Sequence, residues 1–166
     1  MSPLLKLGFA AACALIAGPA CAQAPDAIGA PGEHLVATLH AEGAQIYACV
    51  VDGSGKLAWQ FREPIATLLV DGKTVGRHYA GPNWELADGS AVTAKVAGRA
   101  PGASPADIPL LKLETTAQRG TGLLTGVTTI QRLNTKGGTA EDPCAAAGTF
   151  LSVPYSADYT FFRKGG

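Results

Sequence analysis

The sequence predicts an all-β fold: a single antiparallel β-sandwich or barrel of about ten short strands, with at most one short helical turn. Two observations predict it. Segments in which apolar and polar residues alternate recur at intervals of about 8–12 residues, as they do in such folds. The dipeptide Asp71-Gly72 supplies the positive φ angles of a tight hairpin turn, and a second one, Asp88-Gly89, separates two further strands. The pattern does not distinguish a barrel from a sandwich.

The expected strands follow one another along most of the chain. The first, residues 33–41, also has leucines at helical spacing, Leu35 and Leu39, but its alternation favours a strand. Residues 45–51 alternate more clearly and place Cys49 in a strand. Further strands are expected at residues 57–61, 65–70, 74–79, 83–86, 91–96, 110–115, 126–133, 149–153 and 155–163.

Three other segments carry turn and loop signals. Residues 23–32 contain Pro and Gly throughout, and we expect a loose lead-in to the first strand. Residues 99–109 contain three prolines and are expected to form a loop. Residues 142–148 begin with an aspartate suited to a helix N-cap, continue with a proline and end with a glycine, so they predict one short helical turn that holds Cys144.

Residues 1–22 have the features of a cleavable secretory signal peptide. An apolar stretch of about 11 residues follows Lys6, and a small-x-small site ends at Ala22. Cleavage there removes 22 of the 166 residues and leaves residues 23–166 as a single β domain. Acylation of Cys21 is an alternative that the residues before this cysteine disfavour.

The charge balance of the mature chain argues against a nucleic-acid partner. The signal peptide contains Lys6 and no acidic residue, so 12 of the 13 basic residues remain against 13 acidic ones, a formal net charge of −1. Nucleic-acid binders present a basic excess or cluster, which is absent from this sequence.

No segment has the roughly 20 apolar residues of a transmembrane helix. We therefore expect an extracytoplasmic protein, either periplasmic or fully secreted, without a transmembrane segment.

The cysteine content predicts one disulfide. Cys13 and Cys21 lie in the signal peptide, so the mature chain keeps Cys49 and Cys144. In an oxidising compartment two remaining cysteines are expected to pair. Two buried free thiols are the alternative, and a redox-active pair is disfavoured because no Cys-x-x-Cys spacing is present.

Four stretches of the chain together carry a resemblance to a known family. They are residues 45–49 (QIYAC), 78–85 (HYAGPNWE), 126–138 (GVTTIQRLNTKGG) and 153–159 (VPYSADY). In this order they resemble Domain of Unknown Function 3455, a family of exported bacterial and fungal proteins. The resemblance implies export and a domain of this size, and it implies no activity or catalytic residues.

One cluster of polar and aromatic residues is the candidate ligand-binding site. His78, Tyr79, Asn83, Trp84 and Glu85 surround a Gly-Pro turn. An aromatic ring beside carboxylate and amide groups suits the binding of a small molecule or a sugar ring. The alternative is that the aromatic rings fill the core and that His78 bonds the backbone.

Catalytic, metal and cofactor motifs are absent from the sequence. There is no Gly-x-Ser-x-Gly elbow, and His34, His40 and His78 lack the spacing of a zinc site. We therefore expect neither a metal nor a cofactor.

The first hypothesis is a non-enzymatic protein that binds a small molecule, glycan or envelope component. The alternatives are a hydrolase that uses His78 with Glu85 or Asp88, and a structural envelope protein. The oligomeric state is left open.

Overall fold

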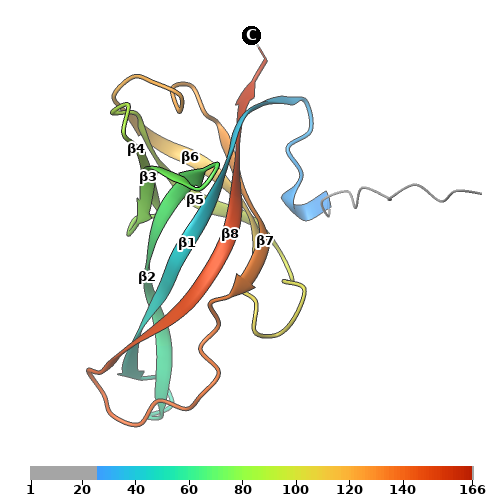
Figure 1. Ribbon diagram of the computed structural model, residues 1–166. Helices are drawn as coiled ribbons and strands as arrows, with labels where there is room; N and C mark the ends of the chain where they lie inside the picture. Colours follow the sequence, from blue (N-terminus) through green and yellow to red (C-terminus); the bar gives the residue numbers. More distant parts are fainter. Residues whose placement is uncertain (1–25, 166) are drawn as a thin grey trace, which may run out of the picture.

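The structure is a computed structural model that describes residues 26–165. Eight antiparallel strands form one closed barrel, in which each strand pairs with its neighbours along the chain and the last strand closes on the first (Figure 1). The strands are β1 (Glu33–Val51), β2 (Leu57–Val70), β3 (Lys73–Tyr79), β4 (Asn83–Leu86), β5 (Ala91–Ala100), β6 (Leu110–Arg119), β7 (Thr129–Gly137) and β8 (Phe150–Lys164). The predicted all-β class is confirmed, and the barrel is the architecture formed. The expected signal peptide, residues 1–22, lies outside the described residues, as does Cys21.

The strands are fewer and longer than expected because three expected breaks do not occur. Gly43 lies inside β1, where a Cβ atom would stand 2.1 Å from the Ile65 carbonyl oxygen, so this glycine permits close pairing with β2 rather than ending the strand. Pro64 lies inside β2 and Pro154 inside β8. Both prolines pair with β1 on one side only, at positions not paired with β3 or β7, so their missing N–H groups interrupt no ladder there.

Three strands extend beyond the others at one end of the barrel (Figure 1). The pairing of β2 with β3 starts at Ala66, and the pairing of β8 with β7 reaches only to Tyr155. Residues 57–65 and 150–154 therefore pair with β1 alone and form a three-stranded extension. On the opposite wall, β4 pairs with β5 only as far as Thr93, so the second half of β5 also lacks a partner on that side.

The disulfide between Cys49 and Cys144 is present, with a Cα–Cα distance of 5.7 Å. It joins β1 to the loop between β7 and β8. The backbone of Cys49 also donates to the Thr149 carbonyl and accepts from the Gly148 N–H, both at 2.9 Å. The helical turn expected at residues 142–148 is wrong: these residues form a loop, because their hydrogen bonds go to the neighbouring strands instead of to one another.

The described part of the lead-in, from residue 26, is ordered, contrary to the expectation of a loose segment. A single 3₁₀ turn, Asp26–Ile28, packs on the outside of β5 and β6. Ile28 is fully buried, and its carbonyl accepts a hydrogen bond from Gln131 Nε2 at 2.6 Å. Gly98 allows this approach, since a Cβ there would lie 2.0 Å from the Ala27 carbonyl oxygen. Within residues 26–165 there is no helix with the length and apolar character needed to span a bilayer.

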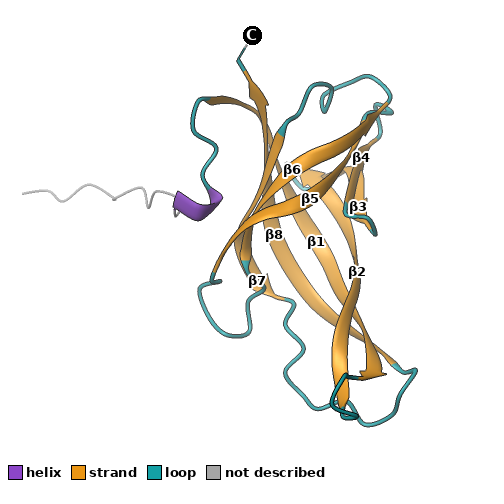
Figure 2. Cartoon of the chain, turned by 180° about the vertical axis from the view of Figure 1, so that it is seen from behind, coloured by secondary structure: helices purple, strands orange, loops and turns teal. Residues whose placement is uncertain are grey.

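The core fills the inside of the barrel, and Figure 2 shows the strands that surround it from behind. Eight strands give an interior that side chains can fill or that can hold one small ligand. The turn at Asp71-Gly72 joins β2 to β3 and so helps to fix which residues of these strands point inward. Both turn residues have the predicted positive φ, 48° and 73°. The largest inward-facing side chains are aliphatic and aromatic: Leu39, Leu68, Trp84, Leu113, Ile130, Tyr159 and Phe161.

We predict that removal of the disulfide destabilises the barrel without changing its fold. The bond spans a sequence separation of 95 residues. The chain-entropy model assigns a loop of this length about 4–5 kcal/mol, and a loss of about 2–5 kcal/mol is expected for Cys49→Ala/Cys144→Ala. Urea unfolding followed by circular dichroism measures this loss, and reduction of the unmodified protein should reproduce it. Equal unfolding free energies for the variant and the oxidised protein would contradict the prediction.

Candidate functional site

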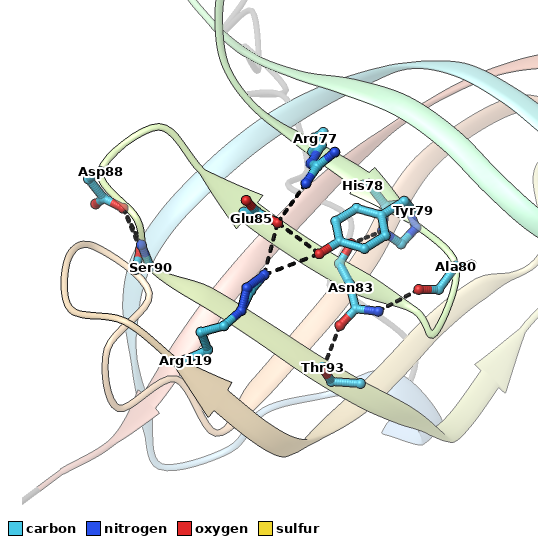
Figure 3. Close-up of polar contacts among 10 residues, drawn as sticks. All are labelled: Arg77, His78, Tyr79, Ala80, Asn83, Glu85, Asp88, Ser90, Thr93 and Arg119. Carbon is cyan, nitrogen blue, oxygen red and sulfur yellow. Dashed lines mark hydrogen bonds and ion pairs between the residues drawn. The ribbon is translucent and has the colours of Figure 1, made fainter.

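The β3–β4 hairpin divides the predicted cluster between the two faces of the barrel wall. Successive residues of a strand point to opposite faces. His78 and Trp84 are buried cross-strand partners that point inward. Tyr79 and Glu85 point outward, toward each other (Figure 3). Asn83 stands at the start of β4, beside the turn. The structure therefore brings together two pairs rather than one five-residue site.

The inward pair forms an aromatic stack. The His78 and Trp84 rings lie 4.4 Å apart at an interplanar angle of 13°, and the Tyr159 ring of β8 packs against both, 4.9 and 5.2 Å away. His78 is 3% exposed. Its Nδ1 lies 2.9 Å from the Asn83 carbonyl oxygen, which can only accept, so Nδ1 carries the proton and donates.

Burial determines the charge of His78. It lowers the pKa of this imidazole to about 3, and it outweighs the hydrogen bond to Asn83, which raises the pKa. His78 is therefore neutral at physiological pH, and its Nε2 is the unprotonated ring nitrogen.

The outward pair belongs to an ion network on the barrel surface (Figure 3). Glu85 Oε2 accepts hydrogen bonds from the Tyr79 hydroxyl at 2.8 Å, from Arg119 at 2.9 Å and from Arg77 at 3.1 Å. The bond from Tyr79, followed by that from Arg77, lowers the pKa of the Glu85 carboxyl. Every component of this network lies on the solvent side of the wall, so its ordinary role is to fix β3, β4 and β6 together.

The remaining polar residues of the region hold turns. Asn83 donates to the Ala80 carbonyl and accepts from Thr93. Asp88 accepts from the Ser90 N–H at 2.8 Å and from the Leu123 N–H at 2.7 Å, which ties the β4–β5 turn to the loop after β6. No hydrogen bond joins His78 to Glu85 or Asp88 among the described contacts, and Glu85 faces away from it. The geometry thus offers no support for the hydrolase alternative.

A cavity of about 510 Å³ adjoins the inward pair. It lies where the short β3–β4 hairpin ends and leaves β2 and β5 without a strand between them. Exposed side chains of these strands stand at its mouth: Phe61, Arg62, Val96 and Arg99. His78, Trp84, Tyr159 and Arg132 line its inner part. The size falls within the range of about 300–1,000 Å³ that is usual for small-molecule sites.

Arg132 is the most deeply buried of the charged cavity residues that the sequence analysis did not identify. It is 8% exposed, and its Nε and Nη2 donate to the Pro109 carbonyl oxygen at 3.1 and 2.9 Å. Two cavity-lining side chains near it also keep buried nitrogens without a hydrogen-bond partner among the described residues, Gln45 Nε2 and Trp84 Nε1. One signal was available in the sequence: Arg132 is two residues from Ile130, so both side chains point to the same face of β7.

No group of three or more metal-ligating side chains occurs between residues 26 and 165. The side chains that line the cavity include guanidinium, imidazole, phenol, amide and indole groups, and the remaining lining is apolar.

Fold and site together define a closed eight-stranded meander barrel with an internal cavity of small-molecule size. A family model described as "Protein of unknown function (DUF3455)" matches residues 30–163, so the chain belongs to this family and the predicted resemblance is confirmed. Comparisons with curated proteins and with solved structures give no match.

The low pKa of His78 predicts a loss of stability in acid. The unfolded imidazole has a pKa of about 6.5, so protonation favours the unfolded chain, and stability present above this pH falls as the pH drops toward 3. Between pH 7 and about pH 4.5 the unfolding free energy should fall by about 2–3 kcal/mol. His78→Phe should remove most of this decrease, whereas the matched change at the exposed His34, His34→Gln, should retain it. Urea unfolding across this pH range measures the effect, and parallel curves for all three proteins would contradict it.

Proposed function

We propose that this protein is a non-enzymatic binding protein that holds one small, largely apolar molecule in the barrel cavity. The observation that carries the proposal is the cavity of about 510 Å³ beside the His78–Trp84 stack. Cavities of this kind, apolar with a few convergent polar groups, are the usual form of small-molecule sites.

The location of Trp84 favours a small molecule over a glycan or another polymer. Trp84 is 0% exposed and lines the inner part of the cavity, so it offers no flat ring on the barrel surface. A polymer needs an open groove, whereas this cavity is bounded by β2, β5 and the turn at Gly81-Pro82. A small ligand that enters between Phe61 and Val96 fits this arrangement.

The alternatives account for fewer of these features. A purely structural envelope protein has no need of an internal cavity lined by arginine side chains, because filling such a space with apolar groups stabilises a barrel. The predicted hydrolase needs Glu85 or Asp88 within reach of His78, and among the described contacts neither carboxylate hydrogen-bonds this imidazole, whose Nδ1 donates to the Asn83 carbonyl.

The disulfide supports an extracytoplasmic site of action. Bonds such as Cys49–Cys144 form and persist in oxidising compartments and are rare in the cytosol. We accordingly place the protein in the periplasm or outside the cell, which agrees with the expected signal peptide.

Tryptophan emission tests where a ligand binds. The chain has two tryptophans, Trp84 at the cavity and Trp59, whose Nε1 donates to the Asp142 carbonyl beside the disulfide. Titration with the neutral apolar dye N-phenyl-1-naphthylamine should quench emission saturably. Trp59→Phe should keep this quenching, and Trp84→Phe should lose most of it. Equal quenching in both variants would place the dye elsewhere and contradict the proposal.

A blocked mouth provides an independent test with a matched control. Val96 lies at the cavity mouth and is 38% exposed; Val70 lies away from the cavity and is 41% exposed. Val96→Trp should fill the mouth and weaken dye binding by at least roughly tenfold, the effect of losing about 1.4 kcal/mol of contact. Val70→Trp should bind like the unmodified protein. Dye fluorescence measures both, and unchanged binding by Val96→Trp would contradict the proposal.

A further inference from the structure

We propose that the ligand of this cavity carries a carboxylate, and that Arg132 binds it. The inference rests on the proposed function and adds the class of ligand: a small organic acid with an apolar body. Its starting point is the charge of the cavity lining, which contains three arginines, Arg62, Arg99 and Arg132, and no acidic side chain.

Arg132 is a buried cation without an acidic partner. No salt bridge to it occurs among the described residues, although it is 8% exposed. A buried charge is strongly unfavourable unless an opposite charge and hydrogen bonds compensate it. Two of its five N–H groups donate to one carbonyl, that of Pro109, which supplies a dipole but no negative charge. An anion in the cavity would supply the missing charge.

The groups around Arg132 do not replace that anion. Its strand neighbour across the β7–β8 pairing is Tyr159, and burial, the largest effect on this phenol, raises its pKa, so the hydroxyl stays neutral. Tyr155 is likewise neutral because burial raises its pKa. His78 is neutral too and adds no competing positive charge beside the guanidinium. The inner cavity therefore keeps a net positive charge at physiological pH.

The two arginines at the mouth differ from Arg132. Arg62 pairs with Glu63 at 3.2 Å and its side chain is 54% exposed. Arg99 is exposed as well. Both suit the attraction of an anion to the entrance, whereas Arg132 suits its capture inside, where water competes less.

A second donor lies in the same lining. Gln45 is 2% exposed, and its Nε2 makes no hydrogen bond of normal length to the described residues, although its side chain lies close enough to the Tyr155 hydroxyl to counter part of the rise that burial causes in the pKa of that phenol. A carboxylate accepts several hydrogen bonds, so one head group can satisfy the guanidinium and this amide together. The apolar body would then lie along Leu111 and Leu113, toward Phe61 and Val96 at the mouth.

The test compares two probes with the same apolar chain, decanoate and decan-1-ol, by displacement of N-phenyl-1-naphthylamine at neutral pH. The unmodified protein should bind decanoate at least roughly tenfold more tightly, because the carboxylate forms charge-assisted hydrogen bonds with the guanidinium and the hydroxyl of the alcohol does not. Arg132→Gln should abolish this preference, measured as the ratio of the two affinities within the same variant, and Arg132→Lys should keep part of it. Arg77→Gln, on the outer face, should keep all of it.

The outcomes separate this inference from the proposed function. If the dye binds but decanoate has no advantage over decan-1-ol in the unmodified protein, the carboxylate inference is wrong and cavity binding stands. The same holds if the preference persists in Arg132→Gln. If the dye itself does not bind, the proposed function fails and the inference with it. The comparison of the two probes in the unmodified protein decides the matter even where Arg132→Gln does not fold.

Discussion

The pairing of β1 with both β2 and β8 is the constraint on which the rest of the structure depends. β1 runs through 19 residues and supplies one edge to each neighbour, so it both closes the barrel and supports the extension at its end. Closure gives every strand two neighbours, and unpaired edges remain where β2, β5 and β8 continue past their shorter partners. The disulfide reinforces the same strand, because Cys49 lies in β1 and binds the loop that leads into β8. A change that loosened β1 would therefore open the ring and the cavity together.

The opening into the barrel follows from unequal strand lengths. β3 and β4 have 7 and 4 residues, whereas β2 has 14 and β5 has 10. The two long strands continue past the short hairpin with no strand between them, and the cavity lies there. Because β-strand side chains alternate between faces, the same hairpin turns His78 and Trp84 inward and Tyr79 and Glu85 outward. The outer ion network can thus hold the hairpin in place without touching the cavity.

Local signals made much of the fold predictable, whereas long-range pairing did not. The residue types of Asp71-Gly72 predicted its turn, and Cys49 and Cys144 were the two cysteines outside the expected signal peptide. Gly43 and Pro154 looked like breaks because the sequence does not tell which side of a strand is paired. The site was half predictable: His78 and Trp84 line the cavity, but Arg132, 48 residues beyond Trp84, joins them only through closure of the barrel. No local pattern distinguishes such an arginine from a surface one.

The polar groups inside the barrel are difficult to explain by stability alone. Arg132 has no acidic partner among the described residues, and Gln45 and Trp84 each keep a buried nitrogen without a hydrogen bond. Each such group weakens the folded state by an amount comparable to a lost hydrogen bond, about 1–3 kcal/mol, and more where charge is involved. Apolar residues of similar volume would pack the same space at less cost. Retention of three under-satisfied donors around one cavity is therefore the pattern expected where the missing partner is a ligand, because binding then restores the hydrogen bonds and the charge balance that the empty barrel lacks.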